Sequence, residues 1–180
     1  MSRRFALAGS LAFCVFFAPA ARADPQTHVA WRPSLCGVGS DEGAWEKTRF
    51  CNGLTGDVLF FRRKNRDFGF GPYVDVTTAG FWDFRWGGGA TVLLPVTENF
   101  PVTLSLGLSE HALRSPAFAA SAFFGARSYN FDGVYNWSLG VFAGVTRDFS
   151  DPHDSLVTLG LEIDGFFVIA PFLFGVSALR

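Results

Sequence analysis

A strict alternation of apolar and small polar residues is the feature that most limits what this chain can fold into. In Val102–Ser109 every even position is leucine or valine, and every odd position is threonine, serine or glycine. A strand places successive side chains on opposite faces. The segment therefore has one apolar face and one face of small polar residues, which predicts an amphipathic β-strand.

The same alternation divides the chain into eight predicted strands. The clear ones are residues 70–80, Phe84–Val96, 102–109, 117–129, 135–147 and 155–164. Two weaker ones are Thr55–Arg63 and His28–Val38, where Pro33 favours a strand end or edge. Residues that favour turns separate the segments, and no linker between domains is visible.

The sequence after Asp164 allows two continuations. Asp164-Gly165 could turn into a ninth strand, Phe166–Val176. Alternatively, the last strand runs on to about Ile169 and Pro171 opens a short C-terminal helix. We prefer the second because it keeps an even number of strands.

Residues 1–23 have the organisation of a secretory signal peptide. Arg3 and Arg4 precede an apolar stretch, Phe5–Ala20, and Ala21-Arg22-Ala23 fits an A-x-A cleavage site. The apolar stretch is too short for a membrane-spanning helix, which needs about 20 residues. We expect cleavage after residue 23, which leaves residues 24–180 as one domain.

Cys36 and Cys51 are predicted to form a disulfide. They are the two cysteines that remain after cleavage, and an even pair in an exported chain favours a bridge. Pairing the first two predicted strands as a hairpin puts both at the base of the Gly39–Gly53 loop. A bridge that closes a loop of this length stabilises by about 3 kcal/mol in the chain-entropy model.

The composition of the polar faces predicts which way the sheet faces. These faces carry glycine, serine, threonine and asparagine, and the only lysines, Lys47 and Lys64, lie outside the clear strands. A water-exposed sheet face carries many charges, whereas small residues suit the interior of a narrow barrel. We expect an all-β, eight-stranded antiparallel up-and-down transmembrane barrel in an outer membrane. The alternative is a soluble periplasmic lipocalin-like carrier with its apolar face inside. The scarcity of basic residues argues against nucleic-acid binding.

Two groups of side chains are assigned roles in this barrel. Ionisable residues on the polar faces are interpreted as a salt-bridge network that fills the lumen, because buried charges need partners. They are Asp57, Asp75, Arg85, Arg127, Glu162 and Asp164. Aromatic residues near strand ends are predicted to form girdles at the membrane interfaces. They are Trp82, Phe84, Trp86, Tyr129, Tyr135 and Trp137.

Connection lengths give an expected orientation. The loops Gly39–Gly53, Phe81–Asp83, Glu110–Pro116 and Asp148–Asp154 share one side. The connections Arg62–Phe68, Val96–Pro101 and Asn130–Val134 share the other side with both termini. Outer-membrane barrels keep short turns in the periplasm and longer loops outside. The disulfide-closed loop is therefore expected to point outward.

A catalytic arrangement is the weakest candidate in the sequence. Ser109 and His111 share a face by parity, with Glu110 between them and His153 on a later loop, so a lipid-modifying barrel enzyme is a second alternative. No G-x-S-x-G elbow or phosphate-binding glycine loop is present, and the three histidines lack metal-ligand spacing. We expect no enzyme activity, cofactor or metal.

Several stretches carry a resemblance to a known class of protein. They are Asn65–Tyr73, Gly87–Ala90, Leu93–Val96 and Phe124–Phe131. With these stretches the chain resembles the small eight-stranded outer-membrane β-barrels of the OmpA-type transmembrane domain, and more closely an uncharacterised barrel family of Gram-negative bacteria. The resemblance implies a monomer in outer-membrane lipid, inserted by the barrel-insertion machinery, and no particular activity. The chain departs from the class at Ala178-Leu179-Arg180, where a terminal aromatic is usual.

Overall fold

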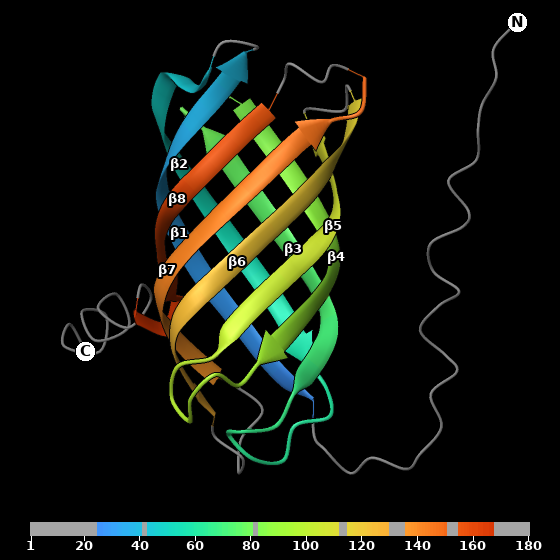
Figure 1. The fold of residues 1–180 in the computed structure, drawn as a ribbon, viewed down its shortest axis with the longest axis vertical. Coiled ribbons are helices and arrows are strands. Elements are labelled where there is room, and N and C mark those ends of the chain that lie inside the picture. The colour runs from blue at the N-terminus through green and yellow to red at the C-terminus, as the bar shows by residue number, and fades with distance from the viewer. Residues whose placement is uncertain are drawn as a thin grey trace, which may run out of the picture.

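The structure is a closed β-barrel of eight antiparallel strands (Figure 1). This computed structural model describes residues 25–40, 43–80, 83–111, 115–129, 136–150 and 155–167. Each strand pairs with the next in sequence, and β8 closes the barrel by pairing with β1. The predicted eight-stranded up-and-down barrel is confirmed. β8 pairs directly with β1, which closes the barrel with eight strands, and most of the alternative ninth strand, residues 168–176, lies outside the described residues.

The strands follow the alternating segments of the sequence closely. Their bounds are β1 Gln26–Ser40, β2 Gly43–Leu59, β3 Gly69–Ala79, β4 Asp83–Leu94, β5 Val102–His111, β6 Ser115–Tyr129, β7 Asn136–Asp148 and β8 Ser155–Asp164.

The predicted bounds of the second strand are wrong. β2 begins at Gly43, not Thr55, and its pairing with β1 reaches Ser40↔Gly43, so most of the predicted Gly39–Gly53 loop is strand. The side chains of residues 47–50 are all exposed. A strand with water on both faces needs no apolar alternation, so the sequence pattern does not reveal it.

The two ends of the barrel differ in their connections. We call the end that holds the start of β1 and the end of β8 the terminal end (bottom of Figure 1). Its connections include residues 60–68 and 95–101, which are longer than residues 80–82 and 112–114 at the opposite end. The expectation that the longer loops lie opposite the termini is therefore wrong, because the longest predicted loop became strand.

The last strand ends earlier than predicted. β8 stops at Asp164 rather than about Ile169, and residues 165–167 are helical. The Asp164 carboxylate accepts a hydrogen bond from the Phe166 backbone N–H at 2.7 Å, as a helix N-cap does. The helix predicted from Pro171 and the signal peptide at residues 1–23 lie outside the described residues. Within the described residues, no helix has the length and apolar character needed to cross a membrane.

The apolar faces of the strands point outward. Leu104, Leu106 and Leu108 on β5 are 42–58% exposed, whereas Thr103 and Ser105, at the alternate positions of the same strand, are each 5% exposed. The barrel interior is therefore largely polar and its outer surface apolar, the reverse of a water-soluble domain. The predicted facing of the strands is confirmed.

Candidate functional site

Exposed aliphatic side chains cover the middle of the barrel wall. We call them the outer belt: Leu35, Leu54, Val74, Leu104, Leu106, Leu108, Leu139, Val141, Leu159 and Leu161. They come from six strands, and alternation alone directs them outward. Such a surface lacks favourable contacts in water.

Exposed aromatic side chains lie toward both ends of this belt. At the terminal end they include Phe60, Phe70, Phe100, Trp137 and Phe167, and toward the opposite end Phe84, Trp86, Phe118 and Phe149. The Trp137 and Phe167 rings meet edge to face, with centroids 6.1 Å apart. Three residues of the predicted girdle are among these exposed aromatics: Trp137 at the terminal end, and Phe84 and Trp86 toward the opposite end. Trp82, Tyr135 and the Tyr129 side chain lie outside the described residues.

A connected group of ionisable side chains fills the lumen toward the terminal end. Arg127 donates to Asp57 Oδ1 at 2.5 Å, and His28 Nδ1 lies 3.1 Å from Asp57 Oδ2. The other ring nitrogen of His28 lies 2.7 Å from the Ser138 hydroxyl, which donates to Glu162 at 3.2 Å. We call these residues, with Arg32, the lumen network.

Arg32 completes the lumen network. Its Nε and Nη2 donate to Glu162 Oε2 at 2.8 and 2.6 Å, and its guanidinium lies 4.8 Å from the centre of the Phe142 ring. The two guanidinium groups of the network therefore each face a carboxylate, as buried charges require. The network links side chains of β1, β2, β6, β7 and β8 across the lumen.

The sequence predicted half of this network. Asp57, Arg127 and Glu162 lie together in it, whereas His28, Arg32 and Ser138 were missed. Parity along β1 was the available signal, because its even residues from Gln26 to Cys36 all face inward. β1 is the most weakly predicted strand, because it contains Pro33, so its alternation does not assign residues to the lumen from the sequence alone.

The remaining predicted residues lie elsewhere in the interior. Arg85 on β4 lies 3.5 Å from Asp83, near the opposite end of the barrel. Asp75 on β3 lines a small internal cavity. Asp164 is buried at the terminal end, where it caps residues 165–167.

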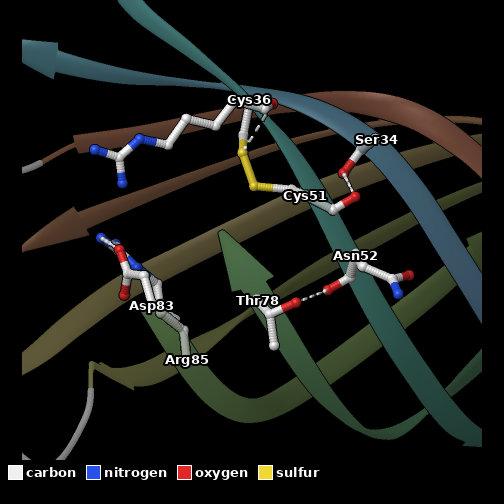
Figure 2. The surroundings of a disulfide bond; sticks show 8 residues. Ser34, Cys36, Cys51, Asn52, Thr78, Asp83 and Arg85 are labelled. Carbon is white, nitrogen blue, oxygen red and sulfur yellow. Dashed lines mark hydrogen bonds and ion pairs between the residues drawn. A yellow bond between two sulfur atoms is a disulfide. The ribbon is translucent and has the colours of Figure 1, made fainter. Parts of the chain in front are cut away.

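The Cys36–Cys51 disulfide lies inside the barrel and joins β1 to β2 (Figure 2). The two Cα atoms are 5.8 Å apart, and both residues are fully buried against Ala79 and Leu156. The predicted pairing is confirmed, but its setting differs from the expectation. The bridge joins two paired strands, with Ser34 directly opposite Cys51, and does not close the base of a long loop.

A cavity of about 50 Å³ lies in the lumen beside the disulfide cluster, lined by Tyr73, Asp75, Arg85, Ser109 and Thr158 among others. Asp75 Oδ1 and Ser109 Oγ are buried there and have no hydrogen-bond partner among the described residues. A water molecule needs about 10–15 Å³ of such volume, so the cavity is large enough for a few waters. Ligand pockets are about 300–1,000 Å³, so it is too small for an apolar ligand.

The candidate catalytic pair gains no support from this geometry. Ser109 is 7% exposed and faces the lumen, not the outer surface of the barrel, where a lipid-modifying nucleophile would have to lie. The His111 side chain lies outside the described residues. Within the described part of the chain, no group of histidine, cysteine, aspartate and glutamate is arranged to hold a metal ion.

The chain matches no protein-family model, no curated protein and no solved structure.

Proposed function

We propose that this protein is an integral outer-membrane β-barrel without enzyme activity, with a structural or interaction role at its exposed ends. The observation that carries the proposal is the outward facing of the apolar strand faces. Leu35, Leu54, Val74 and Leu106 are each more than half exposed. Soluble monomers rarely expose apolar patches larger than about 300–600 Å².

The order of side chains along the wall also supports a membrane setting. Aliphatic residues occupy the middle of the strands, and exposed tryptophan and phenylalanine lie toward both ends. This is the order that the hydrocarbon core and its two interfaces favour, because aromatic rings are stable at headgroup depth.

The interior disfavours the soluble alternative. A lipocalin-like carrier needs an apolar cavity, but this lumen contains the lumen network and a cavity of about 50 Å³. The same contents argue against an open pore. The proposed role therefore lies with the lipid-facing wall and the two ends, not with the lumen.

An even number of strands leaves the start of the first strand and the end of the last strand on one side of the membrane. The start of β1 and the end of β8 meet at the terminal end. An exported chain reaches an outer membrane from the periplasm, so we place the terminal end there. We propose cleavage after residue 23, which an intact mass beginning at Asp24 tests.

Membrane fractionation and gel migration test the proposal. We expect the protein in the outer-membrane fraction, soluble only with detergent. A closed barrel that resists the detergent should migrate faster before boiling than after it. Recovery from the periplasm without detergent contradicts the proposal and favours the carrier.

A further inference from the structure

The connection between β2 and β3 concentrates positive charge beside exposed phenylalanines. We call residues 60–68 the basic loop. Arg63, Lys64 and Arg66 are exposed on it, and Phe61 and Phe68 are 52% and 48% exposed at its two sides. The loop carries one of the two lysines in the whole chain. Cations and aromatic rings side by side suit the headgroup region of a membrane.

The basic loop has an ordered backbone. Phe61 has a φ of 69°, a left-handed conformation unfavourable for a residue with a Cβ. The turn that follows directs Arg62 into the barrel, where it is 2% exposed. Arg62 donates to the carbonyl oxygens of Asn65 and Asp67 at 2.7 and 3.0 Å. The buried arginine thus anchors the loop from inside.

Asp67 holds the other side of the loop. Its carboxylate accepts the backbone N–H groups of Arg63 and Lys64, each at 2.8 Å, and these bonds lower the pKa of Asp67. The negative charge of Asp67 is therefore committed to the backbone. The Arg63 and Lys64 side chains remain directed into solvent.

One acidic residue lies across from these cations. Arg66 is 3.8 Å from Glu98, and the two side chains are 79% and 60% exposed, so their attraction is weak. Arg63, Lys64, Asn65, Arg66 and Glu98 line one open hollow between the basic loop and residues 95–101. The hollow has an excess of positive charge and suits a phosphate group.

We infer that the basic loop binds the phosphate of anionic phospholipid headgroups in the leaflet at the terminal end. The inference rests on the proposed membrane function, because Phe60 at the start of the loop and Phe70 just after it are exposed at the terminal end of the barrel wall. The two phenylalanines pair through their backbones at 2.9 Å, which fixes the loop at that depth. Each basic residue near an anionic membrane surface strengthens binding about fivefold.

Native mass spectrometry of the full chain in zwitterionic detergent tests the inference. The protein is given equimolar phosphatidylglycerol and phosphatidylcholine, and the retained lipids are counted. We expect retention of phosphatidylglycerol, with a preference that declines as salt is added. R63Q/K64Q should reduce the preference about tenfold or more. E98Q should increase it.

The opposite end of the barrel offers a matched control. K47Q/R49Q removes the same two residue types from an exposed part of β2 and should leave the preference unchanged. An equal effect of both double variants overturns the inference, as does a wild-type protein without lipid preference. Stronger retention of lipid A than of phosphatidylglycerol overturns the assignment to phospholipid.

The two proposals fail in different ways. A variant that keeps its heat-modifiable migration has folded, so its lipid preference reports the loop alone. A wild-type chain that is heat-modifiable and membrane-bound but shows no preference overturns only this inference. A chain that is soluble without detergent overturns the membrane function and this inference with it.

Discussion

Arg127 shows how single residues decide the stability of a polar lumen. It is 2% exposed and contacts Asp57 and Thr103, which lie on two other strands. Replacing a buried ion pair by apolar groups costs little, whereas removing one partner leaves an unpaired buried charge. The pair therefore constrains which sequences the barrel tolerates more than it adds to stability.

Removing Arg127 alone should destabilise the barrel strongly. We expect Arg127→Met to lower the free energy of unfolding by about 3–5 kcal/mol, because the Asp57 carboxylate stays buried with only His28 beside it. Urea unfolding in phospholipid vesicles measures the loss. The exposed Arg66→Met is the control and should change stability by no more than about 0.5 kcal/mol.

A double variant separates charge from packing. Asp57→Asn with Arg127→Met removes both charges, and its loss should be much smaller than that of Arg127→Met alone. Equal losses in the single and double variants would mean that the side-chain volume matters and the ion pair does not.

At the scale of elements, β1 and β2 form the longest hairpin of the barrel. Their register runs from Gln26↔Leu59 to Ser40↔Gly43, and the disulfide crosses it inside the wall. Because β1 and β2 pair on both sides of the bridge, with one register shift between Val38 and Ser40, the disulfide acts mainly by restricting the unfolded chain.

Loss of the disulfide should therefore lower stability without changing the fold. We expect C36A/C51A to lose about 3 kcal/mol of unfolding free energy while keeping its heat-modifiable migration. Wild-type protein with reductant should lose the same amount, and reductant should not affect the double variant. Unchanged urea midpoints in both cases would show that the bridge contributes nothing.

The sequence predicted elements where two different environments meet across a strand. β5 separates outward-facing, exposed leucines from buried Thr103 and Ser105, so its alternation is complete. The outer part of β2 has exposed side chains on both faces, so no alternation marks it. The register between strands, which brings His28 to Asp57, leaves no local pattern in either strand.

Two aromatic residues that point into the lumen show what the alternation within a single strand does not predict. Phe123 and Phe142 pair across β6 and β7 and are 2% and 6% exposed, although the residues two places away on each strand, Ser121, Gly125, Gly140 and Gly144, are small. Gly125 and Gly140 make room for the Phe123 ring, because a Cβ on either would lie within 3 Å of it. Such compensation between neighbouring strands depends on register and is not visible in one segment.

At the scale of the whole molecule, apolar side chains cover the outer wall and polar side chains fill much of the lumen, whereas a soluble protein buries its apolar side chains. The outer belt exposes apolar side chains on the wall, whereas the interior contains the lumen network and the disulfide cluster. Stability should therefore depend on where along the barrel axis a substitution lies, because lipid has a hydrocarbon core and polar interfaces.

A charge placed at two depths of the wall tests this dependence. Leu106 lies midway along β5, and Val96 lies in the connection at the terminal end; they are 57% and 62% exposed. We expect Leu106→Arg to cost about 2–4 kcal/mol in vesicles and Val96→Arg about 0–1 kcal/mol, since the charge is costly only at hydrocarbon depth. Leu106→Ala measures the part due to the lost side chain. In a soluble barrel both arginines would face water, so small and equal losses at the two sites would contradict a lipid-facing wall.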